Sequence, residues 1–389
     1  MDVQGLISHR ARSLDASGIR RAFERSARLF DPINLSIGQP DFEVPEAMRE
    51  VVKSAIDEGQ NGYTMTQGAD APIALLQAHL RHDVGWNIPS ENTDVLLTAG
   101  TTGAITLAFM ALLNEGDEAI IPDPYFVVYP ALAELVGGKA VCVDTYPDFR
   151  MTAARVEPLI TERTKLVMVN SPGNPSGVVL SEAELIELEE LCRDRGVVLI
   201  SDEIYDAFTY SDGLENGQFP TPARRTEEML LIRGMGKTYG CTGWRLGYAA
   251  GPKVLIDEMA KLQQYTFVCA PSIVQASMSA IASVDLRPYI DAYEKKRDMV
   301  VQALSPYTNL THPSGAFYAF VEVPPELGET ASQFADRAME DNVIVIPGHI
   351  FSQRDTHFRV SFAIDDERLA KGLEILQRHL KSRTGHPAS

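Results

Sequence analysis

Short apolar runs alternate with longer amphipathic segments between Glu91 and Gly251. The apolar runs predict strands at Asp94–Thr98, Glu118–Pro122, Ala140–Val143, Lys165–Asn170, Val197–Ser201, Met229–Arg233 and Gly247–Ala250. The clearest amphipathic segment is Ser181–Arg193, where Ser181 and Glu184 have the spacing of a capping box. Apolar strands that alternate with helices form a mostly parallel sheet with helices on both faces. The sequence therefore predicts an α/β protein.

The pattern changes after Pro271. Helices are predicted at Ile273–Ser283, Pro288–Leu304, Ala331–Asp341 and Asp365–His379, and strands at Phe317–Glu322, Val343–Ile346 and Phe358–Phe362. This mixture is typical of a smaller α+β domain, which we expect the N-terminal segment to complete. We predict an N-terminal arm over 1–44, a large domain over 45–285 and a C-terminal small domain over 286–389.

Charge and cysteine content exclude some classes of protein. The chain has 35 Lys and Arg against 53 Asp and Glu, a formal net charge of −18, which argues against a broad nucleic-acid or anionic-membrane surface. The uncharged stretch from Val95 to Asn114 is long enough to cross a bilayer, but Gly100–Gly103 interrupts it, so we predict a buried strand, turn and helix. Without an apolar leader, and with four dispersed cysteines, the chain is expected in the cytoplasm.

The glycines around Lys237 do not form a common nucleotide motif. Gly234, Gly236 and Gly240 give G-x-G-x-x-x-G, which has the wrong final spacing for a dinucleotide fingerprint. A phosphate-binding P-loop would need a glycine where Leu231 stands. Neither site is predicted.

A metal site is not predicted either. His79 and His82 are three residues apart, a spacing that places two side chains on one helix face, but no third ligand is near in the sequence. We expect both histidines to be solvated surface groups.

Five motifs follow one another along the chain. They are Pro122-Asp123-Pro124-Tyr125-Phe126; Asn170-Ser171-Pro172-Gly173-Asn174-Pro175-Ser176-Gly177; Ser201-Asp202-Glu203-Ile204-Tyr205; Lys237 followed by Arg245 in Thr242-Gly243-Trp244-Arg245-Leu246-Gly247; and Phe358-Arg359-Val360-Ser361-Phe362. In this order they resemble the motifs of class I/II aminotransferases, pyridoxal-phosphate enzymes of the aspartate aminotransferase fold (fold type I). The resemblance covers Ile37 to Phe362. It implies that the large domain binds pyridoxal 5'-phosphate.

The resemblance assigns four residues to the reactive part of the cofactor. Lys237 matches the lysine that forms a Schiff base and later moves a proton between the substrate and the cofactor. Asp202, after the apolar run of a predicted central strand, matches the carboxylate that keeps the pyridine nitrogen protonated. Tyr205 and Asn174 match the residues that hydrogen-bond the phenolic oxygen.

The cofactor's phosphate needs positive charge and free N–H donors. The turn Gly100-Thr101-Thr102 opens a predicted helix, whose first amides form a natural anion site. By resemblance Arg245 supplies the counter-charge. Tyr63 matches a tyrosine that relatives bring from the neighbouring subunit, which implies a homodimer with shared active sites.

Three positions match groups around the substrate and the ring. Arg359 matches the arginine that binds the substrate α-carboxylate, for which a planar guanidinium offers two parallel hydrogen bonds. Gly38 matches a glycine beside the same carboxylate, and Asn174 also belongs to this part of the site. Phe126 falls where the family stacks an aromatic ring on the pyridine.

Some positions depart from the family pattern and concern the substrate. Gly234 and Gly236 stand where relatives often have serine, and Thr102 stands where an aspartate-specific subgroup has lysine. Ser17-Gly18-Ile19-Arg20 resembles a subgroup with aromatic-active and broad-range enzymes. His349 follows Pro347-Gly348 near the expected substrate entrance, without a derived role. The amino donor is left open among aspartate, aromatic and neutral amino acids.

The expected activity is transamination between an L-amino acid and a 2-oxo acid by a ping-pong cycle, with 2-oxoglutarate and glutamate as one pair. The nearest alternative is a β-lyase or carbon–sulfur lyase, because one fold hosts several reactions. A pyridoxal-phosphate-binding DNA regulator would need a helix-turn-helix domain ahead of Ile37 and a basic surface, and the chain is acidic. Small-molecule substrates and a second copy of the chain are the expected partners.

Overall fold

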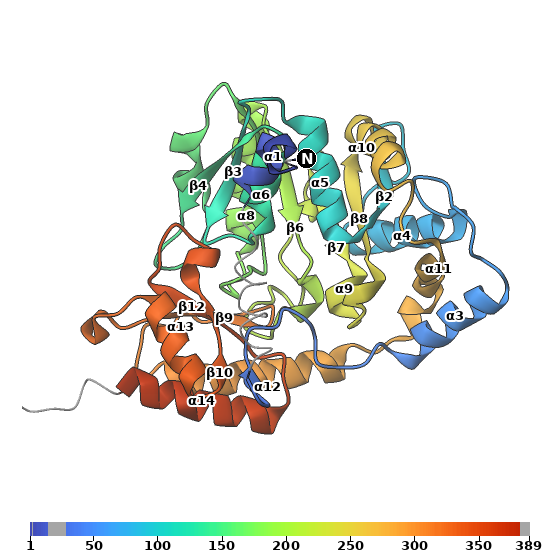
Figure 1. Cartoon of the computed structure of the whole chain (residues 1–389). Helices are drawn as coiled ribbons and strands as arrows, with labels where there is room; N and C mark the ends of the chain where they lie inside the picture. Colours follow the sequence, from blue (N-terminus) through green and yellow to red (C-terminus); the bar gives the residue numbers. More distant parts are fainter. Residues whose placement is uncertain (2, 15–28, 382–389) are drawn as a thin grey trace, which may run out of the picture.

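A seven-stranded sheet forms the centre of the computed structural model, which describes residues 1, 3–14 and 29–381 (Figure 1). Its strands are β2 (Thr93–Ala99), β3 (Glu118–Asp123), β4 (Lys139–Asp144), β5 (Thr164–Asn170), β6 (Val198–Asp202), β7 (Leu230–Gly234) and β8 (Leu246–Pro252). Their order is β2-β8-β7-β6-β5-β3-β4, and β8 alone runs antiparallel to its neighbours. The mostly parallel sheet is confirmed, and each of the seven predicted strands is present.

Helices bury both faces of this sheet. Along β2, Val95 and Leu97 face a core shared with α4 (Asp70–Asp83) and α8 (Glu182–Arg195), whereas Leu96 faces one shared with α5 (Gly100–Leu112), α6 (Val128–Leu135) and α10 (Lys253–Thr266). Successive side chains of a strand point to opposite faces, so an apolar run with no polar alternation is buried on both sides. The structure therefore confirms the α/β class that the sequence predicts.

The stretch Val95–Asn114 forms β2 and α5, so the predicted strand and helix are confirmed. The helix begins at Gly100 itself, without a separate turn. No helix within the described ranges is both long and apolar enough to span a bilayer.

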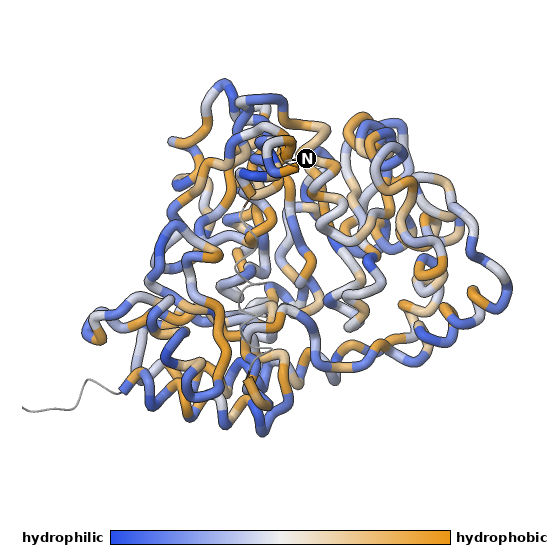
Figure 2. The backbone as a smooth tube through the Cα atoms, in the orientation of Figure 1, coloured by the Kyte–Doolittle hydropathy of each residue, from blue (hydrophilic) through white to orange (hydrophobic). Residues whose placement is uncertain are grey.

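The C-terminal elements pack beside the sheet, in the lower part of Figure 1. They are α12 (Arg287–Leu304), β9 (Tyr318–Glu322), α13 (Ala331–Glu340), β10 (Val343–Ile344), β11 (Ile346–Pro347), β12 (His357–Ser361) and α14 (Asp366–Lys381). Strand β10 pairs with β1 (Ile33–Asn34), which brings the N-terminal segment beside them. Figure 2 shows apolar and polar segments alternating along α14, as expected of a helix with one buried face. The domain limits at residues 44 and 285 stay predictions.

Two predicted elements in this part are wrong. Val343–Ile346 is not one strand, because Val343 pairs with Ile33 in one sheet and Ile346 with Arg359 in another. Ile273–Ser283 is not one α-helix but a short turn, α11 (Ser272–Gln275), followed by a 3₁₀ segment over Ala276–Ser283. Serine hydroxyls in that segment bond carbonyls three residues earlier, which favours the tighter helix.

The predicted capping box of α8 is confirmed. The Ser181 hydroxyl accepts from the Glu184 N–H at 3.2 Å, and the Glu184 carboxylate accepts from the Ser181 N–H at 2.8 Å. Gly196, with φ of +65°, ends the helix in a left-handed conformation. Short-range sequence signals therefore set both ends of α8.

Candidate active site

A cavity of about 390 Å³ opens where the parallel strands of the large sheet end. Polar groups at the carboxyl ends of such strands commonly form ligand sites. The cavity contains eleven of the twelve predicted site residues: Gly38, Gly100, Thr101, Thr102, Phe126, Asn174, Asp202, Tyr205, Lys237, Arg245 and Arg359.

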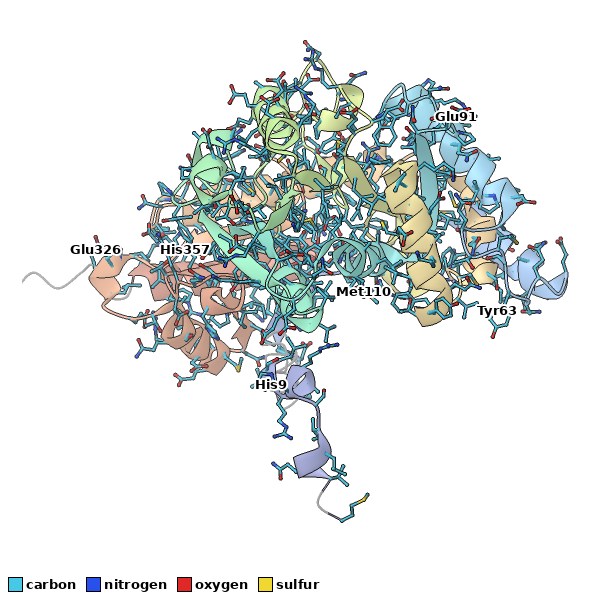
Figure 3. The ribbon with its side chains drawn as sticks, turned by 90° about the horizontal axis from the view of Figure 1, so that it is seen from above. His9, Tyr63, Glu91, Met110, Glu326 and His357 are labelled. Carbon is cyan, nitrogen blue, oxygen red and sulfur yellow. The ribbon has the colours of Figure 1, made fainter. Side chains whose placement is uncertain are left out.

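Tyr63 is the predicted residue that this cavity does not contain. Its side chain is 85% exposed and lines a separate hollow with Thr64 and Gln275. Figure 3 shows Tyr63 at the edge of the molecule, pointing away from its body. The site shared between two chains, to which Tyr63 would contribute, stays a prediction.

Lys237 lies in α9 (Met235–Thr238), directly after β7, and its amine points into the cavity. Its Nζ donates a hydrogen bond to the carbonyl oxygen of Gly38. Burial, with the nearby Arg359 and Arg245, lowers the pKa of Lys237 to about 8. A larger share of this amine is therefore neutral near pH 7 than for an ordinary lysine, and a neutral amine is what a nucleophile requires.

Asp202 is the last residue of β6 and is 2% exposed. Its Oδ2 accepts from the Tyr129 hydroxyl at 2.7 Å, and its Oδ1 from the Ile204 N–H at 3.2 Å. Burial raises the pKa of Asp202 to about 6, while the bond from Tyr129 acts in the opposite direction. The carboxylate is thus mainly charged at pH 7.

Arg359 is 2% exposed, in the middle of β12. It donates from Nη1 to Asn174 Oδ1 at 3.0 Å and from Nη2 to the Ser36 carbonyl at 2.8 Å, while its Nε has no hydrogen-bond partner among the residues that the structure describes. Within the described part of the chain it pairs with no carboxylate. A buried guanidinium without a counter-ion is costly, so this position is suited to an anionic ligand.

Aromatic rings hold Arg359 and Tyr205 in place. The guanidinium carbon of Arg359 lies 4.4 Å from the Tyr318 ring centre and 4.5 Å from that of Phe351. The Tyr318 hydroxyl lies 3.1 Å from that of Tyr205. Tyr318 therefore contacts two predicted site residues at once.

A second anion site lies at the other end of the cavity. Helix α5 begins at Gly100, so the free N–H groups of its first turn point into the cavity. A Cβ at Gly100 would lie 2.7 Å from Nη2 of Arg245, and one at Gly247 would lie 2.7 Å from the Thr101 nitrogen. Glycine at position 100 lets the guanidinium approach the helix start, and glycine at position 247 lets β8 pass close to it. The guanidinium and the free N–H groups can together hold a phosphate.

Sequence reasoning missed Tyr129, Tyr318 and Asn170, which also line the cavity. The sequence contained a signal for Tyr129 as a cavity residue, because it follows Phe126 by three residues, at the start of α6. The side chain of Asn170 accepts from the Asn174 N–H and donates to the Asp202 carbonyl, both at 2.9 Å. The bond to Asp202, 32 residues away, leaves no periodicity in the sequence.

The other residues singled out in the sequence lie elsewhere. His349 does not line the cavity but contacts Ser332 at 3.0 Å and Asp355 at 3.5 Å. His79 and His82 are exposed, and no group of three potential metal ligands occurs among the residues that the structure describes. The Ser17–Arg20 segment is outside the described residues.

Comparison with known proteins agrees with this geometry. Residues 31–376 match the family model of aminotransferase class I and II. The chain is 34% identical to the putative aminotransferase YugH of Bacillus subtilis (strain 168), over 97% of this chain and 99% of that protein. It is 30% identical to aromatic-amino-acid aminotransferase 2 of Thermococcus litoralis, over 97% and 99%.

Solved structures show the same fold. A single mutant of the Thermus thermophilus aspartate aminotransferase aligns with a TM-score of 0.89 and 32% identity, over 96% of this chain and 99% of that one. The buried lysine, the carboxylate and the two anion sites suit pyridoxal phosphate, the cofactor of this family. The chain belongs to the class I and II aminotransferases and is a pyridoxal-phosphate-dependent enzyme of fold type I.

Proposed function

We propose that this enzyme moves an amino group between an L-amino acid and a 2-oxo acid in a ping-pong cycle, with glutamate and 2-oxoglutarate as one pair. The observation that carries the proposal is the arrangement of Lys237, Asp202 and Arg359 around one cavity. It joins an amine with a lowered pKa, a buried carboxylate and a guanidinium that lacks a counter-ion. A transamination site needs one group of each kind.

Each residue near the reacting atoms has a proposed task. When bound, pyridoxal phosphate supplies a carbon that carries the amino group and a ring that withdraws electrons. Lys237 would hold the cofactor covalently, and its free amine would move a proton to and from the substrate α-carbon. Asp202 keeps the pyridine nitrogen protonated. Tyr205 and Asn174 donate to the phenolic oxygen.

The remaining residues bind and orient. Arg245 and the first turn of α5, Gly100–Thr102, bind the cofactor's phosphate. Arg359 binds the substrate α-carboxylate beside Gly38, since its guanidinium is already aligned by Asn174. Phe126 stacks on the ring.

The cavity favours aromatic or neutral amino donors over aspartate. Among its described lining residues, the cationic side chains are Lys237, Arg245 and Arg359, and each already has a task. Gln39 and Thr242 are uncharged donors of the lining that have no other proposed task and are left for the second carboxylate of glutamate. Holoenzyme mixed with single amino acids, and followed by the change in cofactor absorbance, should respond faster to phenylalanine or methionine than to aspartate. A faster response to aspartate would contradict this preference.

Stoichiometry separates transamination from lyase chemistry. Glutamate alone should give one equivalent of 2-oxoglutarate per site and then stop, because a second turnover would require a 2-oxo acid as acceptor. A β-lyase would instead release ammonia and pyruvate continuously from a β-substituted alanine without any acceptor. That second result would contradict the proposed function.

We further propose that two chains form a cytoplasmic homodimer in which Tyr63 of one completes the cavity of the other. Lys237→Ala and Tyr63→Ala should each be nearly inactive. Chains mixed after reversible dissociation should recover about a quarter of the wild-type sites, because half of the dimers are hybrids with one intact site. If hybrids form but no activity is recovered, Tyr63 does not complete the cavity of the other chain, and the proposal is contradicted.

A further inference from the structure

A second cavity, of about 560 Å³, lies behind α9 as seen from the cofactor cavity. Met235 and Thr238 of α9 line the second cavity, whereas Lys237 lines the cofactor cavity. Positions three apart share a helix face, and Lys237 lies on the opposite one. The neighbours Tyr205 and Asp206 are divided in the same way, Tyr205 to the cofactor cavity and Asp206 to the second one. The two cavities are therefore back to back across α9 and this turn.

The wall of the second cavity is largely apolar. Helix α4 contributes Leu76, and the 3₁₀ segment Ala276–Ser283 contributes Met278. His79 and His82 of α4 also line the cavity and are exposed, so a small molecule can enter it from solvent. A cavity of this size, with apolar walls and a few polar groups, is typical of a small-molecule site.

Two buried phenol groups in this wall lack partners. Tyr248 of β8 is 2% exposed and Tyr239 is 7% exposed, and both line the second cavity. Neither hydroxyl has a hydrogen-bond partner among the residues that the structure describes. Tyr248 stands directly opposite Arg233 on the neighbouring strand β7. A buried hydroxyl without a partner is unfavourable, so both phenols are suited to a polar ligand in this cavity.

The charged groups beside these phenols are mostly carboxylates. Arg233 donates from Nη1 to Asp83 at 2.6 Å and from Nε to Glu203 at 2.9 Å. The same Nε lies 3.5 Å from Oδ2 of Asp206, which accepts no hydrogen bond from the described residues, whereas Oδ1 accepts from the next residue's N–H at 2.8 Å. Arg224 also acts on Asp83, so two guanidinium groups face three carboxylates. This end of the second cavity therefore has an excess of negative charge.

We propose that the second cavity binds an apolar organic cation that carries N–H donors, such as an ammonium or guanidinium group on a hydrophobic body. The cationic group pairs with Oδ2 of Asp206, and the oxygens of Tyr239 and Tyr248 accept further N–H bonds. The hydrophobic body lies against Leu76 and Met278. An anion of the same shape would meet the excess of carboxylates, and a neutral molecule would form no ion pair.

The test is isothermal titration calorimetry of the holoenzyme at pH 7.5 with 2-phenylethylguanidine, whose guanidinium does not form an imine with the cofactor. We expect a Kd of about 1 mM or below. The neutral N-(2-phenylethyl)urea, which has nearly the same shape, should bind at least about tenfold more weakly. Asp206→Asn should weaken the cation at least about tenfold and Tyr248→Phe about threefold.

Asp212→Asn is the matched control, because this carboxylate also pairs with an arginine, Arg297 at 3.0 Å, but lies outside the second cavity. It should leave the Kd unchanged. Equal affinity for the urea, or an unchanged Kd in Asp206→Asn and Tyr248→Phe, would overturn the proposal. Should Asp206→Asn not fold, Ala207→Phe fills the second cavity from the same turn and should abolish binding. Binding that persists in Ala207→Phe would equally overturn it.

Discussion

At the residue scale, the cavity holds the guanidinium groups of Arg245 and Arg359, with which no carboxylate of the described residues forms an ion pair. Arg359 is buried with neutral partners, and Arg245 bonds the Thr242 carbonyl at 3.2 Å while its own φ is +54°. The buried charge of Arg359 would be solvated in water, so its placement is unfavourable until a ligand arrives, whereas Arg245 is exposed to solvent. The cavity is therefore locally positive, although the whole chain has a formal net charge of −18.

Gly100 tests whether the approach of Arg245 to the helix start matters. Its φ is +71°, and Gly100→Ala would place Cβ against the guanidinium. We expect about 1 kcal/mol of backbone strain and about tenfold weaker cofactor binding. Gly196→Ala is the matched control, since φ is +65° there and nothing lies within 4 Å of the new Cβ. Equal cofactor affinity in both variants would contradict the close approach.

Lys237 should leave a signature in the pH dependence of stability. Its pKa is near 8 in the folded apoenzyme but near its ordinary value when unfolded, so between these values the unfolded chain binds more protons. The wild-type apoenzyme should therefore gain stability relative to Lys237→Met as the pH rises from 8 to 10. Urea unfolding of both proteins at each pH measures this difference, and a flat difference would show that the lysine is not perturbed.

At the element scale, the site depends on strand ends and helix starts that local sequence controls. Strand β6 delivers Asp202, β7 leads into Lys237, and α5 begins at Gly100. Helix α8, which begins with the capping box, packs on the same sheet through Leu185 and Leu188.

Ser181→Ala should lower the free energy of unfolding by about 1 kcal/mol, because the hydroxyl no longer accepts from the Glu184 N–H or donates to the Glu184 carboxylate. Chemical denaturation of the apoenzyme measures the change. Glu187→Ala is the control, since this residue is exposed in the interior of the same helix and should change stability by less than about 0.5 kcal/mol. Similar losses in both variants would argue against the cap.

At the scale of the whole molecule, exposed apolar side chains gather around Tyr63. The Tyr63 face comprises Tyr63, Met65, Tyr265, Phe267 and Val268. Its two segments are joined by hydrogen bonds from Gln263 to the Thr66 carbonyl at 2.7 Å and from Gln275 to the Thr64 hydroxyl at 3.2 Å. Apolar side chains gathered in this way mark an interaction surface.

Tyr265→Lys should weaken self-association by at least about tenfold, because it puts a charge into an apolar contact. Sedimentation velocity over a range of concentrations measures this. Val254→Lys is the matched control, since Val254 is 79% exposed near the other end of α10, beside the bond from Lys253 to Asn92. Equal effects of both changes would contradict an interface on the Tyr63 face.

Local sequence determined much of this protein. Apolar runs predicted the seven strands and the capping box predicted the start of α8, because these features depend on near neighbours in the chain. The ordered motifs supplied seven of the eleven predicted residues that line one cavity. Tertiary structure decided what distant residues do together. It split Val343–Ile346 between two sheets and placed Tyr129 on Asp202, 73 residues away. Such contacts depend on how whole elements pack, and packing leaves no local pattern to read.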